Sequence, residues 1–391
     1  MRVLILSFYY EPDLCAGSFR TTALVSALHE RAPGDTKIDV VTTLPNRYST
    51  YVRPAAETER TAGIEIWRIK LPTHRSDMLG QCRAFVRFAR QAWKLVAKKE
   101  YDVVFATSSR LMTATLGALI ARRKHVPLYL DIRDIFAETM KDVLPPLVSR
   151  PVFWLCSLVE SWTMRRADRI NLVSRGFEGY FRSRYGDRSF AWFTNGIDEE
   201  FLAVPPPCKE HVVQERATVL YAGNIGEGQA LHNVLPGLAH ALHSRARFVV
   251  IGDGGRRAAL EAAIGHVDNV EMRPPVGRPE LLRAYRAADV LFVHLGSQPA
   301  FERVLPSKVF EYAALGKPLL AGVAGYAAHF IREEIANAAV FEPGNVSDAV
   351  NAFESLKLTT HPRPEFIAKY ARTNIANAMA DDILQLCRAD R

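Results

Sequence analysis

Short runs of apolar residues alternate along this chain with longer stretches in which apolar residues recur at helical spacing. This alternation is typical of a parallel sheet whose strands are joined by helices on both faces. The pattern runs through the first half of the chain and then begins again. The predicted strands are Val3–Ser7, Ile38–Thr42, Ile64–Ile69, Val103–Ala106, Leu128–Asp131 and Arg169–Val173, followed by Thr218–Ala222, Phe248–Gly252, Val270–Met272, Val290–His294, Pro318–Ala321 and Ala339–Phe341.

The proline-rich segment Val204–Cys208 separates the two series and has the composition of a linker. We therefore predict two doubly wound α/β domains that face each other across a cleft. The first covers residues 1–200 and the second covers residues 201–371. Ligands bind beyond the carboxyl ends of the strands in such sheets, so candidate site residues are expected there.

The segment Leu305–Pro318 opens with a proline and a serine and closes with glycine and proline, which predicts a helix from Ser307 to Leu315. The start of a helix has unpaired backbone N–H groups and a positive dipole end, which together favour phosphate. Glu311 lies one helical turn after Ser307 and is placed to hold a ribose while the helix start holds the attached diphosphate. The alternative is a core helix with a solvated glutamate, and the spacing alone favours neither.

Glycines follow the first strand of each predicted domain. Gly17 and Ser18 come after the first strand of the chain, where a glycine allows a ligand to approach the backbone. Neither this segment nor the two glycine segments of the second domain is a GxGxxG fingerprint, and a plain turn is the alternative for each of the three. The second domain supplies the remaining candidates, in two segments: Gly223, Asn224 and Gln229, and then Gly252, Asp253 and Gly254.

Charged residues extend this candidate site. Arg303 and Lys308 flank the predicted phosphate-binding helix start and are placed to neutralise a leaving diphosphate. Asp131, Arg133 and Asp134 end a strand of the first domain and are candidates for contact with an acceptor. An ion-paired strand end explains these three residues equally well, and solvated surface is the common alternative for the two cations.

Composition narrows the function classes. The 391-residue chain has 50 Lys and Arg against 42 Asp and Glu, a net charge of +8. We find no nucleic-acid module, so anionic lipid or a phosphorylated small molecule is the expected partner. The five scattered cysteines fit a reducing compartment. No DxD dipeptide and no His-Glu-x-x-His motif occurs, so we expect no protein-held metal, and His294 is interpreted as a structural residue.

Residues 83–99 form a basic amphipathic pattern. Cations recur every three or four residues, and aromatic and aliphatic residues recur on another face. Such a helix can lie in a membrane interface, although most amphipathic helices pack on their own domain. No apolar run approaches the ~20 residues that span a bilayer, and the first residues are interpreted as a buried strand rather than a signal peptide. The candidate membrane residues are Arg83, Arg87, Arg90, Trp93 and Lys94.

Taken together, the chain resembles the retaining GT-B glycosyltransferases of the family-4 type, and in particular the bacterial L-fucosamine-transferase-like enzymes of surface polysaccharide synthesis. The likeness spans nearly the whole chain and depends on the order and spacing of its motifs. These motifs are Tyr9–Ser18, Arg133-Asp134, Asn195–Asp198, Gly223–Gly226, Gly252–Gly254 and Pro306–Glu311.

The resemblance implies two Rossmann-like domains, with the donor mainly in the second. It implies that Glu311 binds the donor ribose, that the backbone around Ser307, Lys308 and Val309 binds the diphosphate, and that main chain near Val276 meets the base. It implies that Gly17 and Ser18 reach the donor from the first domain. It also implies that the last helix, about residues 372–391, packs back on the first domain.

Three departures from the family pattern concern the site. Arg303 stands where the family has a glutamate eight residues before Glu311. Asn224 and Gln229 stand where an arginine and a lysine are usual. Arg133 stands where a histidine precedes the aspartate. We therefore predict that Lys308 or Arg303 supplies the missing positive charge.

The expected activity is sugar transfer with retention from a nucleoside diphosphate sugar, chiefly a UDP-sugar, to a lipid-linked or growing glycan acceptor. No cofactor, metal or nucleic acid is expected. The expected location is cytoplasmic, peripheral at the inner face of the inner membrane. Two alternatives stay open: a nucleotide-sugar epimerase of the same fold, and a nucleotide-sugar-binding subunit without turnover.

Overall fold

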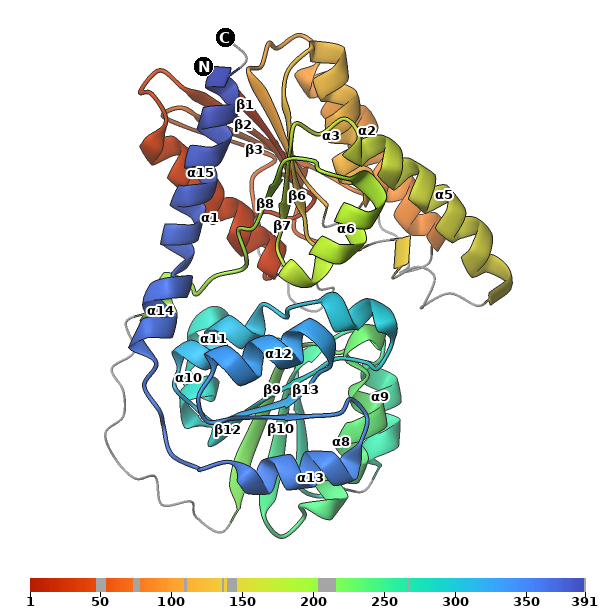
Figure 1. Ribbon diagram of the computed structural model, residues 1–391, viewed down its shortest axis with the longest axis vertical. Helices are drawn as coiled ribbons and strands as arrows, with labels where there is room; N and C mark the ends of the chain where they lie inside the picture. The colour runs from red at the N-terminus through yellow and green to blue at the C-terminus, as the bar shows by residue number, and fades with distance from the viewer. Residues whose placement is uncertain are drawn as a thin grey trace. The chain divides into compact units, whose positions relative to one another are not determined.

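The computed structural model describes residues 1–46, 54–72, 78–108, 111–135, 137–138, 146–202, 216–265 and 267–389. The chain forms two compact units (Figure 1). Unit 1 comprises Met1–Asn195 together with Arg372–Arg391, and unit 2 comprises Gly196–Ala371. The predicted linker Val204–Cys208 lies outside the described residues.

Unit 1 contains a sheet of eight strands in the order β3-β4-β2-β1-β5-β6-β7-β8. Every neighbouring pair is parallel except β3 and β4, which are antiparallel at one edge. The central strands are almost entirely buried, as expected of a parallel sheet covered on both faces. The strands are β1 (Arg2–Leu6), β2 (Lys37–Thr43), β3 (Thr58–Thr61), β4 (Ile64–Ile69), β5 (Val103–Thr107), β6 (Leu128–Ile132), β7 (Arg169–Leu172) and β8 (Phe190–Ala191).

Helices cover both faces of this sheet. The C-terminal helix α15 (Arg372–Ala389) packs beside α1 (Ala16–Arg31) over one core cluster of unit 1. Helix α3 (Leu111–Lys124) packs against both α2 (Met78–Val96) and α5 (Pro146–Met164) (Figure 1). The shorter elements are η1 (Arg175–Phe177) and α6 (Glu178–Tyr185).

Unit 2 contains a six-stranded sheet in the order β11-β10-β9-β12-β13-β14, and all of its pairs are parallel. Two apolar clusters lie on its two faces. The strand order places β9 at the point where the connections change direction, which is where ligands bind in doubly wound sheets. The strands are β9 (Ala217–Asn224), β10 (Ala246–Asp253), β11 (Val270–Arg273), β12 (Val290–His294), β13 (Leu319–Gly322) and β14 (Ala338–Phe341).

The helices of unit 2 join these strands in turn. Helix α11 begins after Ser307 and ends before Gly316, whose positive φ of 69° places it in the left-handed region that favours glycine at the end of a helix. The predicted helix Ser307–Leu315 is therefore confirmed. The elements are α7 (Glu199–Leu202), η2 (Glu227–Gln229), α8 (Leu231–Ala241), α9 (Arg257–Ile264), α10 (Arg278–Ala287), η3 (Pro299–Arg303), α11 (Lys308–Ala314), α12 (Gly325–Glu334), α13 (Val346–Ser355) and α14 (Pro364–Tyr370).

Candidate functional site

The two glycine segments of unit 2 lie side by side at the carboxyl ends of neighbouring strands. Strand β9 ends at Asn224 and β10 ends at Asp253, and the register pairs Gly223 with Gly252. A Cβ atom on Gly252 would overlap the carbonyl oxygen of Gly223, so the two backbones approach each other only because that position has no side chain. The predicted segments therefore form one continuous edge.

Lys308 lies directly over this edge. Its side chain occupies the space above Gly223, and a Cβ atom there would overlap Nζ and Cε of the lysine. The Nζ atom also lies 4.2 Å from the centre of the Tyr221 ring, within the range of a cation–π interaction. The structure thus brings together Gly223 and Lys308, which are 85 positions apart in the chain and belong to two different predicted motifs.

The charge of Lys308 is poorly compensated. Within the described part of the chain, Nζ makes no hydrogen bond and no ion pair. Burial lowers the pKa of Lys308 to about 7, although the carboxylate of Glu311 acts in the opposite direction. A lysine in this state gains charge and stability when an anion arrives, as expected of a group that binds phosphate.

Glu311 lies one turn further along α11 and is buried. Its Oε1 accepts a hydrogen bond of 3.0 Å from Arg278, and its Oε2 lies 3.5 Å from the Tyr285 hydroxyl. The solvated glutamate of a plain core helix is thus excluded for this residue.

Arg278 was not predicted as a site residue. It also pairs with Asp198 at 2.5 Å and with Glu200 at 2.6 Å. Burial opposes its charge, but the carboxylates, led by that of Glu311, outweigh burial and hold the pKa of Arg278 above its ordinary value. Arg278 follows Gly277 at the start of α10 and is followed by a proline at the second position of that helix. This is an ordinary helix-start pattern, which gave no sign of a role beside Glu311.

Asn224 and Gln229 contact each other. The amide of Asn224 donates to Oε1 of Gln229 at 2.7 Å, and the Gly226 N–H donates to the same oxygen at 3.2 Å. The resemblance implies cations at these two positions, and the structure instead has two neutral side chains there that are hydrogen-bonded to each other.

His294 makes a hydrogen bond to the backbone of this loop. Its Nε2 accepts from the Gly344 N–H at 3.2 Å, so its Nδ1 carries the proton and donates to the carbonyl of Gln229 at 2.7 Å. Burial lowers the pKa of His294 to about 4. The histidine is a neutral structural residue, as interpreted from the sequence.

The other candidates of unit 2 lie around this centre. Ser307 is the N-cap of α11, and Val309 is fully buried in its first turn. Val276 is half-buried ahead of α10 and packs on the core. Arg303 ends η3 and is half-buried. Gly254 follows β10, and its N–H donates to the Asp253 carboxylate at 2.8 Å. The roles of these residues in donor binding stay predictions.

In unit 1, Gly17 and Ser18 lie in the first turn of α1 and are both buried. The N-cap residue Cys15 makes no side-chain hydrogen bond to this helix start within the described residues. The Oγ atom of Ser18 is buried and has no hydrogen-bond partner in the described part of the chain. Backbone N–H groups and a hydroxyl at an uncapped helix start are suited to an anionic or sugar ligand, and donor binding by this loop stays a prediction.

Asp131 has a structural role. Both of its oxygens accept from Arg20, at 2.9 and 3.0 Å, and Asn171 donates to Oδ1 at 2.7 Å. Both members of the ion pair are buried, and Arg20 also donates to the carbonyl of Phe193. The alternative of an ion-paired strand end therefore describes Asp131, which has little capacity left for an acceptor. Sequence reasoning missed Arg20 because it lies 111 positions from its partner.

Arg133 and Asp134 follow the carboxyl end of β6. The Arg133 N–H donates to the Ser108 hydroxyl at 2.9 Å, and Asp134 is exposed. Burial lowers the pKa of Arg133, with Asp131 acting against this effect and Arg20 adding to it. One terminal nitrogen of Arg133 is buried without a hydrogen-bond partner among the described residues. Both residues stay candidates for acceptor contact.

The basic segment 83–99 lies mostly in α2. Its apolar residues Phe88, Ala92 and Val96 are buried in unit 1. Its cations face solvent, so the structure has a surface helix packed on its own domain. The cations Arg83, Arg87, Arg90 and Lys94 and the ring of Trp93 are all exposed.

Metal clusters and membrane-spanning helices are both absent from the described residues. No cluster of three or more His, Cys, Asp or Glu side chains is arranged to hold a metal ion in that part of the chain. No helix there is long and apolar enough to cross a membrane.

Comparison with known families matches both halves of the chain. Residues 18–190 match the model of a glycosyl transferase 4-like domain, and residues 216–357 match the model named glycosyl transferases group 1. A curated Pseudomonas aeruginosa protein described as "Probable glycosyltransferase WbjE" is 26% identical over 208 residues. That match covers 49% of this chain, and the chain spans about half (49%) of the length of this relative.

Solved structures share the fold along the whole chain. Sucrose-phosphate synthase from Thermosynechococcus elongatus superposes with a TM-score of 0.73 at 14% identity, covering 99% of each chain. Anabaena Alr3699/HepE, solved in complex with UDP, superposes with a TM-score of 0.64 at 15% identity, covering 98% of this chain and 100% of that one. These likenesses confirm the predicted GT-B class of fold, with two parallel-sheet α/β domains.

Proposed function

We propose that this chain, whose two halves match models of glycosyltransferase domains and whose fold is of the GT-B class, is a glycosyltransferase that transfers a hexosyl or hexosaminyl residue from a nucleoside diphosphate sugar. The donor is a UDP-sugar, and the acceptor is a lipid-linked or growing glycan of a bacterial surface polysaccharide. The presence of UDP in the HepE structure supports the choice of base. The donor is a co-substrate, and no cofactor is invoked.

The observation that carries this proposal is the position of Lys308. A partly buried ammonium without an ion-pair partner among the described residues lies over Gly223, at the carboxyl ends of β9 and β10. Removing a cation from water without compensation is costly, and a bound diphosphate supplies the missing charge. In the proposed complex the diphosphate lies between Nζ of Lys308 and the backbone at the start of α11, and Arg303 adds further positive charge.

Glu311 accepts the ribose hydroxyls in this arrangement. Its carboxylate already accepts from Arg278 at 3.0 Å, which fixes the side chain and its charge. Each carboxylate oxygen can accept more than one hydrogen bond, so the ribose need not displace the arginine. We place the base beside Val276, with Asp253 and Gly254 lining the end of β10, and Asn224 and Gln229 holding the neighbouring loop.

The chemical step breaks the bond between the anomeric carbon and the diphosphate oxygen, and forms a bond from that carbon to the acceptor oxygen. We propose that the acceptor hydroxyl attacks from the side of the leaving group, so that the configuration is retained. Its proton passes to the departing diphosphate oxygen, and no protein base is assigned. Lys308 stabilises the negative charge that grows on the diphosphate, the kind of electrostatic contribution that is often the largest.

Unit 1 contributes Gly17 and Ser18 to the donor and Arg133 and Asp134 to the acceptor in this proposal. A lipid-linked acceptor places the enzyme at a membrane surface. We therefore propose a cytoplasmic protein that is peripheral at the inner face of the inner membrane, in contact with anionic lipid.

A panel of UDP- and GDP-sugars, offered to the purified chain with and without a bacterial lipid extract, tests the activity. The proposal expects release of nucleoside diphosphate that depends on the extract, together with a labelled lipid product. Isomerised donor without any acceptor would instead indicate an epimerase. Donor binding without transfer or hydrolysis would indicate a binding subunit.

The ribose contact has its own test. The variant Glu311→Gln keeps the size of the side chain and removes its charge. We expect it to bind UDP at least about 10-fold more weakly, since a hydrogen bond to a charged group contributes about 1.5–3 kcal/mol. It should also lose most of the wild-type preference for UDP over 2′-deoxy-UDP, measured by calorimetry. An unchanged preference would remove Glu311 from the ribose site.

A further inference from the structure

The exposed apolar side chains of this protein are concentrated on one group of helices. Large apolar residues that face solvent in the described part of the chain all lie on α2, α3 and α5. Helix α3 packs between the other two, so the three helices form one continuous face of unit 1 (Figure 1). These residues, which we term the apolar patch, are Val86, Trp93, Met112, Leu119, Trp154, Leu155 and Leu158.

Helix α5 contributes the most exposed part of the patch. Trp154 is 65% exposed, Leu155 is 58% exposed and Leu158 is 48% exposed. These residues recur at three- and four-residue spacing, so they lie along one side of the helix. Soluble monomers rarely expose a contiguous set of large apolar side chains, and such a set marks a surface that binds a partner or a membrane.

The charge of the same face indicates which partner. Helices α2, α3 and α5 have 19, 14 and 19 residues and together contain one carboxylate, Glu160. Glu160 is buried and accepts hydrogen bonds from the hydroxyls of Tyr180 and Tyr185. The exposed charges of the three helices are therefore all positive. Basic and apolar residues on one face favour a bilayer with anionic lipids, where each cation adds to the attraction.

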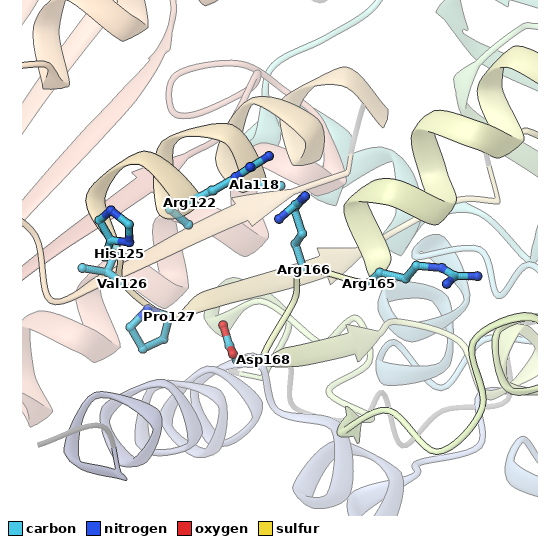
Figure 2. Close-up of a pocket in the computed structure, with 9 residues that line it drawn as sticks. Ala118, Arg122, His125, Val126, Pro127, Arg165, Arg166 and Asp168 are labelled. Carbon is cyan, nitrogen blue, oxygen red and sulfur yellow. The ribbon is translucent and has the colours of Figure 1, made fainter.

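A basic hollow of about 370 Å³ adjoins this face between the ends of α3 and α5. Figure 2 shows Arg122 of α3 and Arg166 at the end of α5 extending toward one another across it. The Nε atom of Arg166 is buried and has no hydrogen-bond partner among the described residues. The one carboxylate that lines the hollow, Asp168, accepts the backbone N–H of Leu128 at 2.8 Å. The guanidinium of Arg166 lies over the ring of Trp162, at 4.4 Å from its centre. Two guanidinium groups without a carboxylate between them among the described residues suit a phosphate.

The hollow is separate from the predicted transfer site. It is lined by Val126 and Pro127, which precede β6, whereas Arg133 and Asp134 follow that strand. The five residues of β6 span roughly 16 Å, so the hollow and the candidate acceptor residues lie at opposite ends of this strand.

We propose that the face formed by α2, α3 and α5 is the surface that docks on an anionic bilayer. Trp154, Leu155 and Leu158 enter the interface, the cations of α2 lie over the lipid headgroups, and the hollow at Arg122 and Arg166 takes the phosphate of one phospholipid. The inference rests on the proposed function for its choice of a membrane as the partner. It revises the expectation from residues 83–99, because the apolar side of α2 is buried and α5 supplies the inserting residues.

Flotation of the full chain with vesicles tests this proposal. The probes are phosphatidylcholine vesicles with and without phosphatidylglycerol. The variants are a triple change of Trp154, Leu155 and Leu158 to Ser, and a double change of Arg122 and Arg166 to Gln. A matched control changes Arg332 and Lys357, exposed cations of unit 2, to Gln.

Wild type and the control should float with anionic vesicles and stay behind with neutral ones. The triple variant should lose at least about tenfold in partitioning. The partitioning of the double arginine variant into anionic vesicles should fall about fivefold for each charge removed. The control variant should keep the partitioning of the wild type. UDP binding by the same variants, measured without vesicles, should be unchanged, so a failed docking face is distinguishable from a failed transferase.

Equal flotation of wild type and the triple variant would overturn the proposal. The proposal would also be overturned if the wild type did not float with anionic vesicles. The same holds if light scattering showed a wild-type dimer that the triple change converts to a monomer, with no effect of vesicles on either protein. Equal losses in the double arginine variant and its control would remove the hollow from the docking face.

Discussion

The pKa of about 7 at Lys308 makes the affinity for a diphosphate depend on pH. At pH 7 about half of the free protein has a charged Lys308, and at pH 9 almost none has. A bound diphosphate next to Nζ favours the charged form and raises this pKa. The complex therefore takes up a proton when it forms at alkaline pH, and donor affinity falls as the pH rises above 7.

The size of this effect follows from the pKa. Well above pH 7, each further pH unit weakens the free energy of UDP binding by about 1.4 kcal/mol, as long as the lysine in the complex stays charged. Between pH 7, where about half of the free protein has a charged Lys308, and pH 9, the affinity for UDP should fall by up to about 50-fold, or about 2.3 kcal/mol. Below about pH 6 the lysine is almost fully charged in the free protein, so it contributes little further change.

Titration calorimetry with UDP at pH 7, 8 and 9 measures the slope. Two buffers with different ionisation enthalpies at each pH give the number of protons taken up directly. The variant Lys308→Met has no charge to gain, so we expect weaker binding that is flat with pH. Lys317→Gln is the matched control, because burial also lowers the pKa of Lys317 but it lies beyond the end of α11.

A wild-type affinity that stays constant from pH 7 to pH 9 would refute the role of Lys308 in binding the diphosphate. The same conclusion would follow if Lys317→Gln, and not Lys308→Met, abolished the slope.

Three further changes test other parts of the structure. Gly223→Ala places a Cβ atom on Nζ and Cε of Lys308, so UDP affinity should fall at least about tenfold through the displaced cation, and calorimetry showing wild-type affinity would contradict this placement. His294 has a pKa of about 4 in the folded protein and protonates near pH 6.5 when unfolded. Its contribution to the free energy of unfolding should therefore be complete above pH 6.5 and fall by about 3 kcal/mol as the pH drops toward 4. Urea unfolding of His294→Phe should lack this part of the dependence of stability on pH. Asp131→Asn leaves the buried guanidinium of Arg20 without its charged partner, so urea unfolding should show a loss of about 3–5 kcal/mol, and a loss under about 1 kcal/mol would mean that the pair is not buried in solution.

The strands and the phosphate-binding helix could be predicted from the sequence because their signals are local. Twelve apolar runs correspond to β1, β2, β4–β7 and β9–β14. The missed strand β3 has the polar sequence Thr-Glu-Arg-Thr at an exposed sheet edge, where no apolar alternation is required. The missed strand β8 has two residues, too few for a periodic signal.

The charge network of the site could not be predicted in the same way. Arg278 meets Glu311 across 33 positions and Asp198 across 80 positions. A single sequence carries no signal for such pairs, because each member alone is an ordinary charged residue near a turn. Asn224 and Gln229 are only five positions apart in the sequence, but their contact depends on the loop conformation rather than on the residue types.

Hydrophobic patterning likewise could not show which apolar faces are covered. The sequence of α2 has the stronger basic amphipathic pattern, yet its Phe88 is fully buried against unit 1. Helix α5 is rich in large apolar residues, which favours burial, yet its Trp154 is 65% exposed. Periodicity finds an apolar face, and only the packing of neighbouring helices determines whether that face remains in solvent.

The central claim is that α11 and the β9–β10 edge hold the donor. A crystal of the full chain grown or soaked with UDP tests it most directly. We predict that the diphosphate lies within hydrogen-bond distance of Nζ of Lys308 and of the first backbone amides of α11, with the ribose hydroxyls on the carboxylate of Glu311. Uridine diphosphate bound elsewhere, with Lys308 still over Tyr221 and without a phosphate contact, would contradict the account.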